Sequence, residues 1–140
     1  MEEYLTRYRE WLERLPEGSD LAQELRGISG NEDEIKERFY KELEFGTAGL
    51  RGILGAGTNR MNEYTVGRAA QGIADFIRET GPAAMEKGVV IAHDPRHFSR
   101  EFTELSAEVF AANGIEVYIY DQLMPVPCLS YATRALCCAG

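Results

Sequence analysis

The first third of the chain carries apolar side chains at the three- and four-residue spacing of helices with one buried face. Residues 3–15 follow this spacing, and Pro16 and Gly18 end the pattern. Ser19 is placed to cap a second helix that runs to about residue 26. The apolar positions of the first helix are Tyr4, Leu5, Tyr8, Trp11, Leu12 and Leu15.

A third helix is predicted after Asn31, because Asn31 and Glu34 have the spacing of a capping box. Its apolar side carries Ile35, Phe39 and Leu43. We therefore expect residues 1–44 to form a helical N-terminal extension that packs against the rest of the protein.

Residues 45–140 alternate between strand and helix patterns, which is typical of an α/β layered sheet. The predicted strands cover about 47–54, 88–93 and 115–120, and the predicted helices cover about 65–79, 99–113 and 127–139. Gly55-Ala56-Gly57 predicts a hairpin turn, and Ser99 is expected to cap the second of these helices. The inward face expected for the first of them holds Val66, Ala69, Ala70, Ile73, Phe76 and Ile77. The fold class is therefore a three-layer α/β/α mixed-sheet domain.

The sequence stops at Gly140, directly after the last predicted helix. In an α/β unit such a helix returns the chain to another strand. We therefore expect this sequence to be a fragment of a longer protein.

The formal net charge is −8, and most of it lies in the first third of the chain. Residues 1–44 hold 13 acidic and 7 basic side chains, and residues 45–140 hold 10 and 8. No basic run suits nucleic acid, and no stretch is long and apolar enough for a membrane. The first residues are acidic rather than those of a secretory signal.

The sequence has an odd number of cysteines and no C-x-x-C pair; they are Cys128, Cys137 and Cys138. This pattern favours a reducing cytoplasm. We expect Cys137 and Cys138 to be small buried residues on the last helix.

The run FGTAGLRG at residues 45–52 contains several candidate ligand-binding residues. Glycines let the backbone approach a ligand closely, Thr47 offers a hydroxyl, and the forked cation of Arg51 suits phosphate oxygens. Two interpretations stay open on composition alone. The run is either a phosphate-handling turn or a glycine-rich hairpin with a surface arginine.

Asp94 and Arg96 directly follow a predicted strand, where ligand sites of open α/β sheets lie. They are either part of a site or a structural ion pair that fixes a strand-to-helix turn. His93 and His97 have the i,i+4 spacing of zinc ligands on a helix, but Pro95 between them argues against a helix. No metal ligands are therefore assigned.

Two further arginines, Arg60 and Arg68, either add positive potential near a cleft or are solvated charges, and the second interpretation is favoured for Arg68. No serine lies in a glycine-rich turn beside a base. No complete catalytic constellation is therefore present in residues 1–140.

Three motifs together resemble the N-terminal domain of the α-D-phosphohexomutases, the family of phosphoglucomutases and phosphomannomutases. They are FGTAGLRG at residues 45–52 with GAGTNRMN at 55–62, AHDPR at 92–96, and MPVP at 124–127. Their order is that of the family, and they are most similar to the branch that contains phosphopentomutases. The resemblance departs at Val126, where the family usually has threonine, so the role of this position is in doubt.

The resemblance implies that the full-length protein moves a phosphoryl group between the C1 and C6 (or C5) hydroxyls of a sugar phosphate. A phosphoserine, a sugar 1,6-bisphosphate intermediate and Mg²⁺ take part in this family's reaction. By resemblance, Arg51 contacts the transferring phosphate, Thr47 and Gly49 shape that contact, and Asp94 and Arg96 form the floor of the cleft.

The family's reactive serine lies in a T-A-S-H-N-P motif, which would come a few residues after Gly140. The metal loop and the sugar-reading loop would also lie downstream. We therefore expect residues 1–140 alone to be inactive, and the remaining mutase domains to be their partners in cis. A non-catalytic phosphosugar-binding or protein-interaction module is the alternative. Which sugar phosphate is used, and what roles His93 and His97 have, cannot be read from this sequence.

Overall fold

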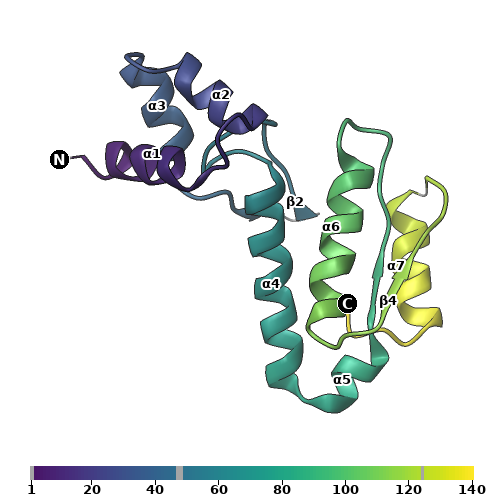
Figure 1. Ribbon diagram of the computed structural model, residues 1–140. Coiled ribbons are helices and arrows are strands. Elements are labelled where there is room, and N and C mark those ends of the chain that lie inside the picture. Colours follow the sequence, from purple (N-terminus) through teal and green to yellow (C-terminus); the bar gives the residue numbers. More distant parts are fainter. Residues whose placement is uncertain (1, 47–48, 124) are drawn as a thin grey trace. The chain divides into compact units, whose positions relative to one another are not determined.

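The computed structural model describes residues 2–46, 49–123 and 125–140 (Figure 1). The described chain forms two compact units, one up to Thr65 and one from Val66 onward. This division falls inside helix α4 (Glu63–Thr80). The expected boundary between an extension of 1–44 and a domain of 45–140 stays a prediction.

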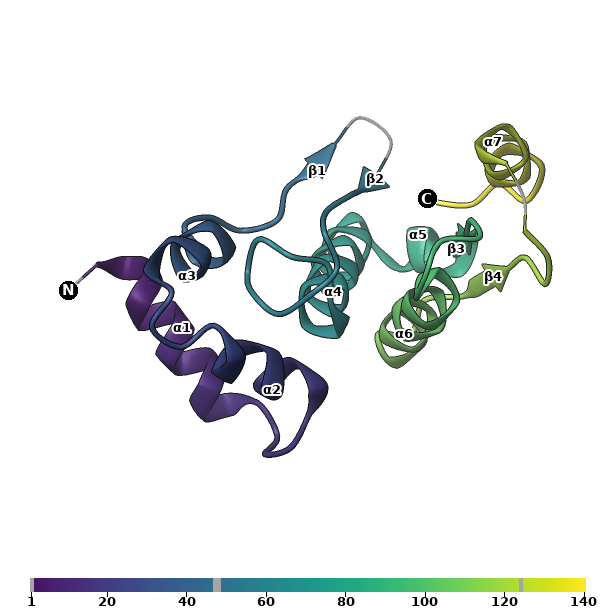
Figure 2. The same cartoon turned by 90° about the horizontal axis from the view of Figure 1, so that it is seen from above.

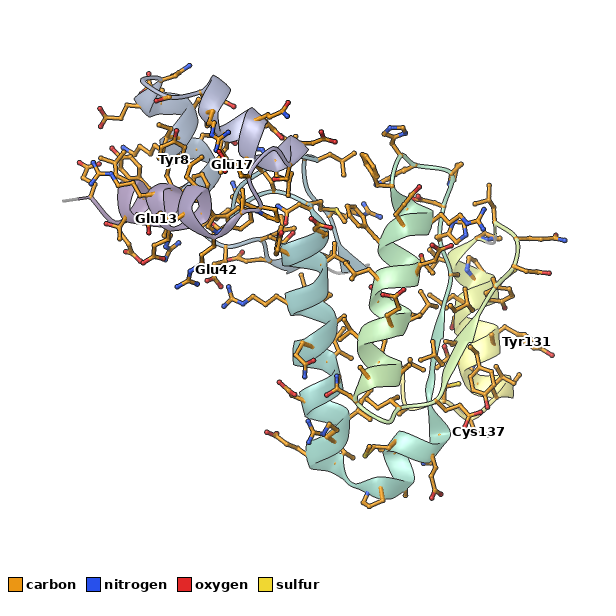
Figure 3. The ribbon with its side chains drawn as sticks, in the orientation of Figure 1. Tyr8, Glu13, Glu17, Glu42, Tyr131 and Cys137 are labelled. Atoms are coloured by element: carbon orange, nitrogen blue, oxygen red, sulfur yellow. The ribbon has the colours of Figure 1, made fainter. Side chains whose placement is uncertain are left out.

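Three helices, α1 (Glu3–Arg14), α2 (Asp20–Gly27) and α3 (Glu32–Phe39), build the first unit around an aromatic core. Figure 3 labels Tyr8 among these helices, where its hydroxyl donates to the Leu25 carbonyl over 2.9 Å. The core residues are Tyr4, Tyr8, Leu15, Ala22, Leu25, Ile35, Phe39 and Ala56. The amphipathic spacing of residues 3–15 therefore predicted the buried face of α1 correctly.

The predicted caps of α2 and α3 are present. The Ser19 hydroxyl accepts from the Ala22 amide, and the Asn31 side chain accepts from the Glu34 amide, each over 3.3 Å. Helix α3 ends at Phe39, before Leu43, which the sequence placed on its apolar side. It ends there because a later loop supplies donors to its last carbonyls, as described below.

Two short strands, β1 (Phe45–Gly46) and β2 (Gly49–Leu50), pair antiparallel. The strand predicted over 47–54 is therefore wrong in extent. Between β2 and α4, the described residues form an isolated parallel bridge between Leu54 and Met61, so the glycine turn at 55–57 belongs to a wider loop and the predicted hairpin is wrong.

Helix α4 buries Val66, Ala70, Ala74 and Ile77. The prediction that Ile73 and Phe76 face inward is wrong, since they are 40% and 71% exposed. A short helix, α5 (Pro82–Lys87), was not predicted, since six residues show too little periodicity.

The second unit contains a parallel pair of strands, β3 (Val89–Ile91) and β4 (Val117–Ile119), joined by helix α6 (Ser99–Ala112). Helix α7 (Val126–Ala135) contacts β3, and α6 contacts β4. Figure 2 shows α6 and α7 on opposite sides of the strand pair. This layered arrangement confirms the predicted α/β fold class. Its core consists of Ala70, Ala74, Ile77, Val89, Phe110 and Ile115.

Helix α6 begins without the predicted serine cap. The N-cap position is Phe98, with a positive φ of 64°, and Ser99 is already the first helical residue. The Ser99 hydroxyl is instead bonded to Asp94 at 2.6 Å. The serine therefore ties the helix to the preceding loop.

Helix α7 ends at Ala135, so the prediction that Cys137 and Cys138 are buried on this helix is wrong. Cys137 is exposed with φ 55°, and Figure 3 labels it beyond the end of α7. This turn returns the chain to β3, where the Ala139 amide donates to the Gly88 carbonyl over 2.8 Å. Cys138 is half-buried.

Among the described residues, none of the helices combines the length and the apolar character that crossing a membrane requires.

Candidate functional site

A cavity of about 400 Å³ lies in the first unit, beside the β1–β2 hairpin. Its lining comes from the C-terminal end of α3, the segment before and within β1, and the chain that follows β2. The lining residues are Glu37, Tyr40, Lys41, Leu43, Glu44, Phe45, Gly46, Arg51, Gly52, Ile53, Asn59 and Arg60. The glycine-rich run therefore places Arg51, which is exposed, in the lining of this cavity.

Arg51 directly follows β2 and lines this cavity. The hairpin pairs Phe45 with Leu50 and Gly46 with Gly49. Gly49 has a φ of 103°, which a side chain would strain, so glycine is required at this position. Thr47, the other predicted member of this site, lies outside the described residues.

Gly52 sets the backbone next to Arg51. A Cβ atom at this position would lie 2.6 Å from Cδ1 of Leu43. A side chain at this position would require the Leu43 side chain to shift, so glycine allows the two segments to lie this close. Gly52 and Leu43, which both line the cavity, therefore lie against one another next to Arg51.

The loop after the hairpin is fixed by a charged clamp. Arg38 donates to Glu24 over 2.5 Å and to Glu34 over 2.8 Å. Arg38 also donates to the Ala56 carbonyl, and Glu24 accepts from the Ala56 amide. Further along the loop, the backbone amide of Asn59 donates a hydrogen bond to the Arg38 carbonyl near the end of α3, over 2.9 Å. The loop and the C-terminal end of α3 therefore satisfy each other's backbone hydrogen-bonding groups.

Asn62 joins the same loop to helix α4. Its side-chain NH₂ donates to the carbonyls of Gly55 and Gly57, over 2.9 and 3.1 Å. Its side-chain oxygen accepts from the amides of Tyr64 and Thr65 at the start of α4. Asn62 is buried, and its hydrogen-bonding capacity is filled.

Arg60 is not a solvated charge, which was one of the two interpretations of this residue. It is only 5% exposed and pairs through both terminal nitrogens with Glu37. The hydrogen bonds from Arg60 hold the pKa of Glu37 below its usual value, against the effect of burial. The Arg60 Nε has no hydrogen-bond partner among the described residues.

Asp94 and Arg96 lie in the second unit and contact one another. Asp94 accepts from the Ser99 hydroxyl at 2.6 Å and from the Arg96 amide at 3.1 Å, and it pairs with the Arg96 side chain at 3.2 Å. The Ser99 hydrogen bond is the main cause that lowers the pKa of Asp94, and Arg96 adds to it. This geometry supports the interpretation of a structural ion pair at a strand-to-helix turn.

The histidines make local contacts. His93 Nδ1 lies 3.2 Å from the Asp94 carbonyl, and the His97 ring packs against Phe98. In the part of the chain that the structure describes, no three His, Cys, Asp or Glu side chains gather in a way that could hold a metal ion. These residues therefore do not fit a magnesium site, and no chemistry is assigned to a metal on them.

Sequence reasoning missed two residues of this region, Lys41 and Asn62, and it left two interpretations open for a third, Arg60. Lys41 lies just beyond α3 with its ammonium group over the Tyr40 ring, and it lines the cavity with Arg51. The signal for Asn62 was available, since Asn62 and Thr65 have N-cap spacing ahead of the helix. The burial of Arg60 had no local signal, because its partner Glu37 lies 23 residues earlier.

Fold and site together define an α/β domain with a cavity whose lining includes Lys41, Arg51 and Arg60. The family described as phosphoglucomutase/phosphomannomutase, alpha/beta/alpha domain I, matches residues 42–140. The chain therefore belongs to the phosphoglucomutase/phosphomannomutase family, which confirms the resemblance seen in the three motifs.

Relatives with assigned activities cover most of this chain. A probable phosphoribomutase of Schizosaccharomyces pombe is 42% identical over 73% of the chain. The phosphopentomutase of Homo sapiens is 36% identical over 79%, and the phosphoglucomutase of Staphylococcus haemolyticus is 41% identical over 72%. The matched region spans only 17–19% of the length of these relatives. No solved structure matches the chain.

Proposed function

We propose that this chain is the first domain of a phosphosugar mutase. The whole protein would transfer a phosphoryl group between the C1 and the C6 or C5 hydroxyl of a sugar phosphate, through a phosphoserine and a sugar bisphosphate. The observation that carries the proposal is the position of Arg51. It follows the β1–β2 hairpin, lines a cavity and lies within the segment matched to domain I.

In this proposal Arg51 binds the phosphoryl group while it is transferred. A guanidinium presents a fixed fork of donors to phosphate oxygens, and it stays charged at any physiological pH. Catalysis of phosphoryl transfer depends mainly on positioning and on stabilising the charge of the transferred group. Gly52, the next residue, lets the backbone beside Arg51 lie close to Leu43.

The remaining parts of the reaction are assigned to the rest of the protein. The reactive serine, the ligands of Mg²⁺ and the residues that read the sugar would come from downstream domains acting in cis. When bound there, Mg²⁺ would stabilise the charge of the transferring phosphoryl group. Asp94 and Arg96 would shape the cleft through the turn before α6. A cytoplasmic location is part of the same proposal.

The second candidate is a non-catalytic module that binds a phosphosugar or a protein. Its support is the acidic character of residues 1–44, which could serve as an interaction surface. The reading frame after codon 140 separates the two candidates. A T-A-S-H-N-P-like motif there supports the mutase, and a stop codon supports the module.

Kinetics of the full-length protein test the mutase directly. Arg51→Ala should lower kcat/KM for ribose or glucose phosphate interconversion by about 10²–10³-fold, and Arg51→Lys should recover part of the loss. Arg100→Ala serves as the matched control, because Arg100 is exposed and its ion pair in the described part of the chain is with Glu104, one turn along α6. An unchanged rate in Arg51→Ala would remove Arg51 from the phosphate site. Interconversion by residues 1–140 alone would contradict the assignment of the nucleophile to a later domain.

A further inference from the structure

The hairpin that precedes Arg51 is too short to hold its own geometry. Strands β1 and β2 have two residues each, and within the described part of the chain they form a sheet of their own. A two-stranded hairpin is only marginally stable in water by itself. The course of the backbone at Arg51 therefore depends on what holds the two legs of the hairpin, residues 41–44 before β1 and 51–54 after β2.

The loop before α4 is hydrogen-bonded to both legs. On the first leg, the Thr58 hydroxyl donates to the Lys41 carbonyl over 2.7 Å. The Leu43 amide donates to the Thr58 carbonyl over 2.8 Å. On the second leg, the Met61 amide donates to the Ile53 carbonyl over 2.8 Å. One segment therefore holds the base of the hairpin from both sides.

This loop is in turn anchored on the end of α3. The Asn59 amide donates to the Arg38 carbonyl over 2.9 Å, and its side-chain NH₂ donates to the Glu37 carbonyl over 3.1 Å. Gly57 lies so close to α3 that an added Cβ would be 2.8 Å from the Arg38 carbonyl oxygen. The Thr58 hydroxyl, which follows directly, also lies 3.5 Å from that oxygen. Thr58 therefore presents its hydroxyl from a backbone fixed on both sides.

We propose that Thr58 is a positioning residue for Arg51, because its hydroxyl fixes the first leg of the hairpin. The first leg reaches Arg51 through Leu43, whose side chain lies against Gly52, the next residue. This inference rests on the proposed function, since the role of Arg51 in phosphoryl transfer belongs to that proposal. A displacement of about 1 Å at a reacting site can lower a rate by about 10²-fold, so holding the hairpin has a kinetic consequence.

Steady-state kinetics of the full-length protein test this role. Thr58→Val removes the hydroxyl at nearly constant volume, and it should lower kcat by about tenfold while KM changes by less than about twofold. Thr58→Ser keeps the hydroxyl and should stay within about twofold of the wild type. The matched control is Thr133→Val, which removes a half-buried hydroxyl that donates to the Leu129 carbonyl within α7. Equal kcat in the two valine variants would overturn the proposal.

A double-mutant cycle shows whether Thr58 acts through Arg51. In the Arg51→Ala protein, Thr58→Val should lower kcat by less than about twofold, because the group that it positions is already absent. A general loss of stability would instead lower kcat by the same factor in both backgrounds. A tenfold effect that persists in the Arg51→Ala protein would therefore refute the positioning role.

Hydrogen–deuterium exchange of the full-length protein gives a readout that does not depend on activity. Thr58→Val should speed the exchange of amides in residues 41–46 and 49–54 by about fivefold, and it should leave residues 3–14 of α1 unchanged. Unchanged exchange in the hairpin segments would overturn the proposal. A wild-type protein without mutase activity would contradict the proposed function instead, and the exchange rates would still decide whether Thr58 holds the hairpin.

Discussion

Arg38 and Glu24 meet at 2.5 Å and together hold both polar backbone groups of Ala56. One side chain comes from α3 and the other from α2, so the loop at 55–57 is fixed by the helical part of the unit. Because Ala56 is fully buried, its amide and carbonyl have no water to replace these partners.

Glu24→Gln should destabilise the first unit by about 1–3 kcal/mol, because it weakens a charge-assisted bond to Arg38 and disturbs the Ala56 amide. Urea unfolding followed by Trp11 fluorescence measures this, since Trp11 packs edge-on against Phe39. The control is Glu3→Gln, which removes an exposed pair with Arg7 and should cost no more than about 0.5 kcal/mol. Equal effects of the two variants would show that the clamp adds no stability.

Gly57→Ala should destabilise the same unit by about 2 kcal/mol or more. An added Cβ would lie 2.8 Å from the Arg38 carbonyl oxygen, and the φ of 137° is strained for any side chain. Gly27→Ala is the matched control, because nothing lies within 4 Å of its Cβ position at the end of α2. That variant should be neutral or stabilising by up to about 1 kcal/mol. Thermal unfolding by circular dichroism compares the two, and a tolerated Gly57→Ala would contradict the close packing of loop and helix.

The acid stability of the turn before α6 should depend on Asp94. Its pKa is lowered mainly by the Ser99 hydroxyl, so the folded state binds a proton less readily than the unfolded chain. The resulting stabilisation is present above the usual aspartate pKa of about 3.9, and it is lost as the pH falls through the lowered value. Ser99→Ala should move the pKa of Asp94 upward.

The carboxyl ¹³C signal of Asp94 reports that pKa directly, in the wild-type chain and in Ser99→Ala. Ser106→Ala is the control, because that hydroxyl bonds the Phe102 carbonyl within α6. A titration curve that Ser99→Ala leaves in place would contradict the role of the Ser99 hydrogen bond.

Alkylation should distinguish the two adjacent cysteines. Cys137 is exposed, whereas burial and the neighbouring Cys137 raise the pKa of the Cys138 thiol. Iodoacetamide at neutral pH should therefore modify Cys137 first, since the thiolate is the reactive form. Tandem mass spectrometry of the C-terminal peptide locates the adduct. The preference should disappear in urea, and equal rates in the folded chain would refute it.

The sequence predicted correctly the helices that depend on interactions between residues close together in the chain. Helical spacing and two side-chain caps placed α1, α2 and α3. The extent of strands depends on pairing with distant segments, so the stretch over 47–54 was predicted too long. Phe76 was wrongly predicted to face inward for a similar reason. Its exposure depends on which distant segments pack against α4, and the local apolar pattern does not show this.

The candidate site was likewise predicted only where a local sequence motif marks the residue. Arg51 could be found because glycines surround it, but Lys41 belongs to no motif, and for Arg60 the sequence did not decide between a cleft residue and a solvated charge. Their presence in one cavity follows from the return of the loop onto the end of α3, which the sequence alone did not indicate.

Asn62 has a consequence for how this region moves. Its amide holds the carbonyls of Gly55 and Gly57 with one end and the first turn of α4 with the other. Opening either segment therefore breaks bonds of the other. The loop and the helix start form one cooperative unit of local unfolding, and their slowest amides should exchange with solvent hydrogen through a shared opening event.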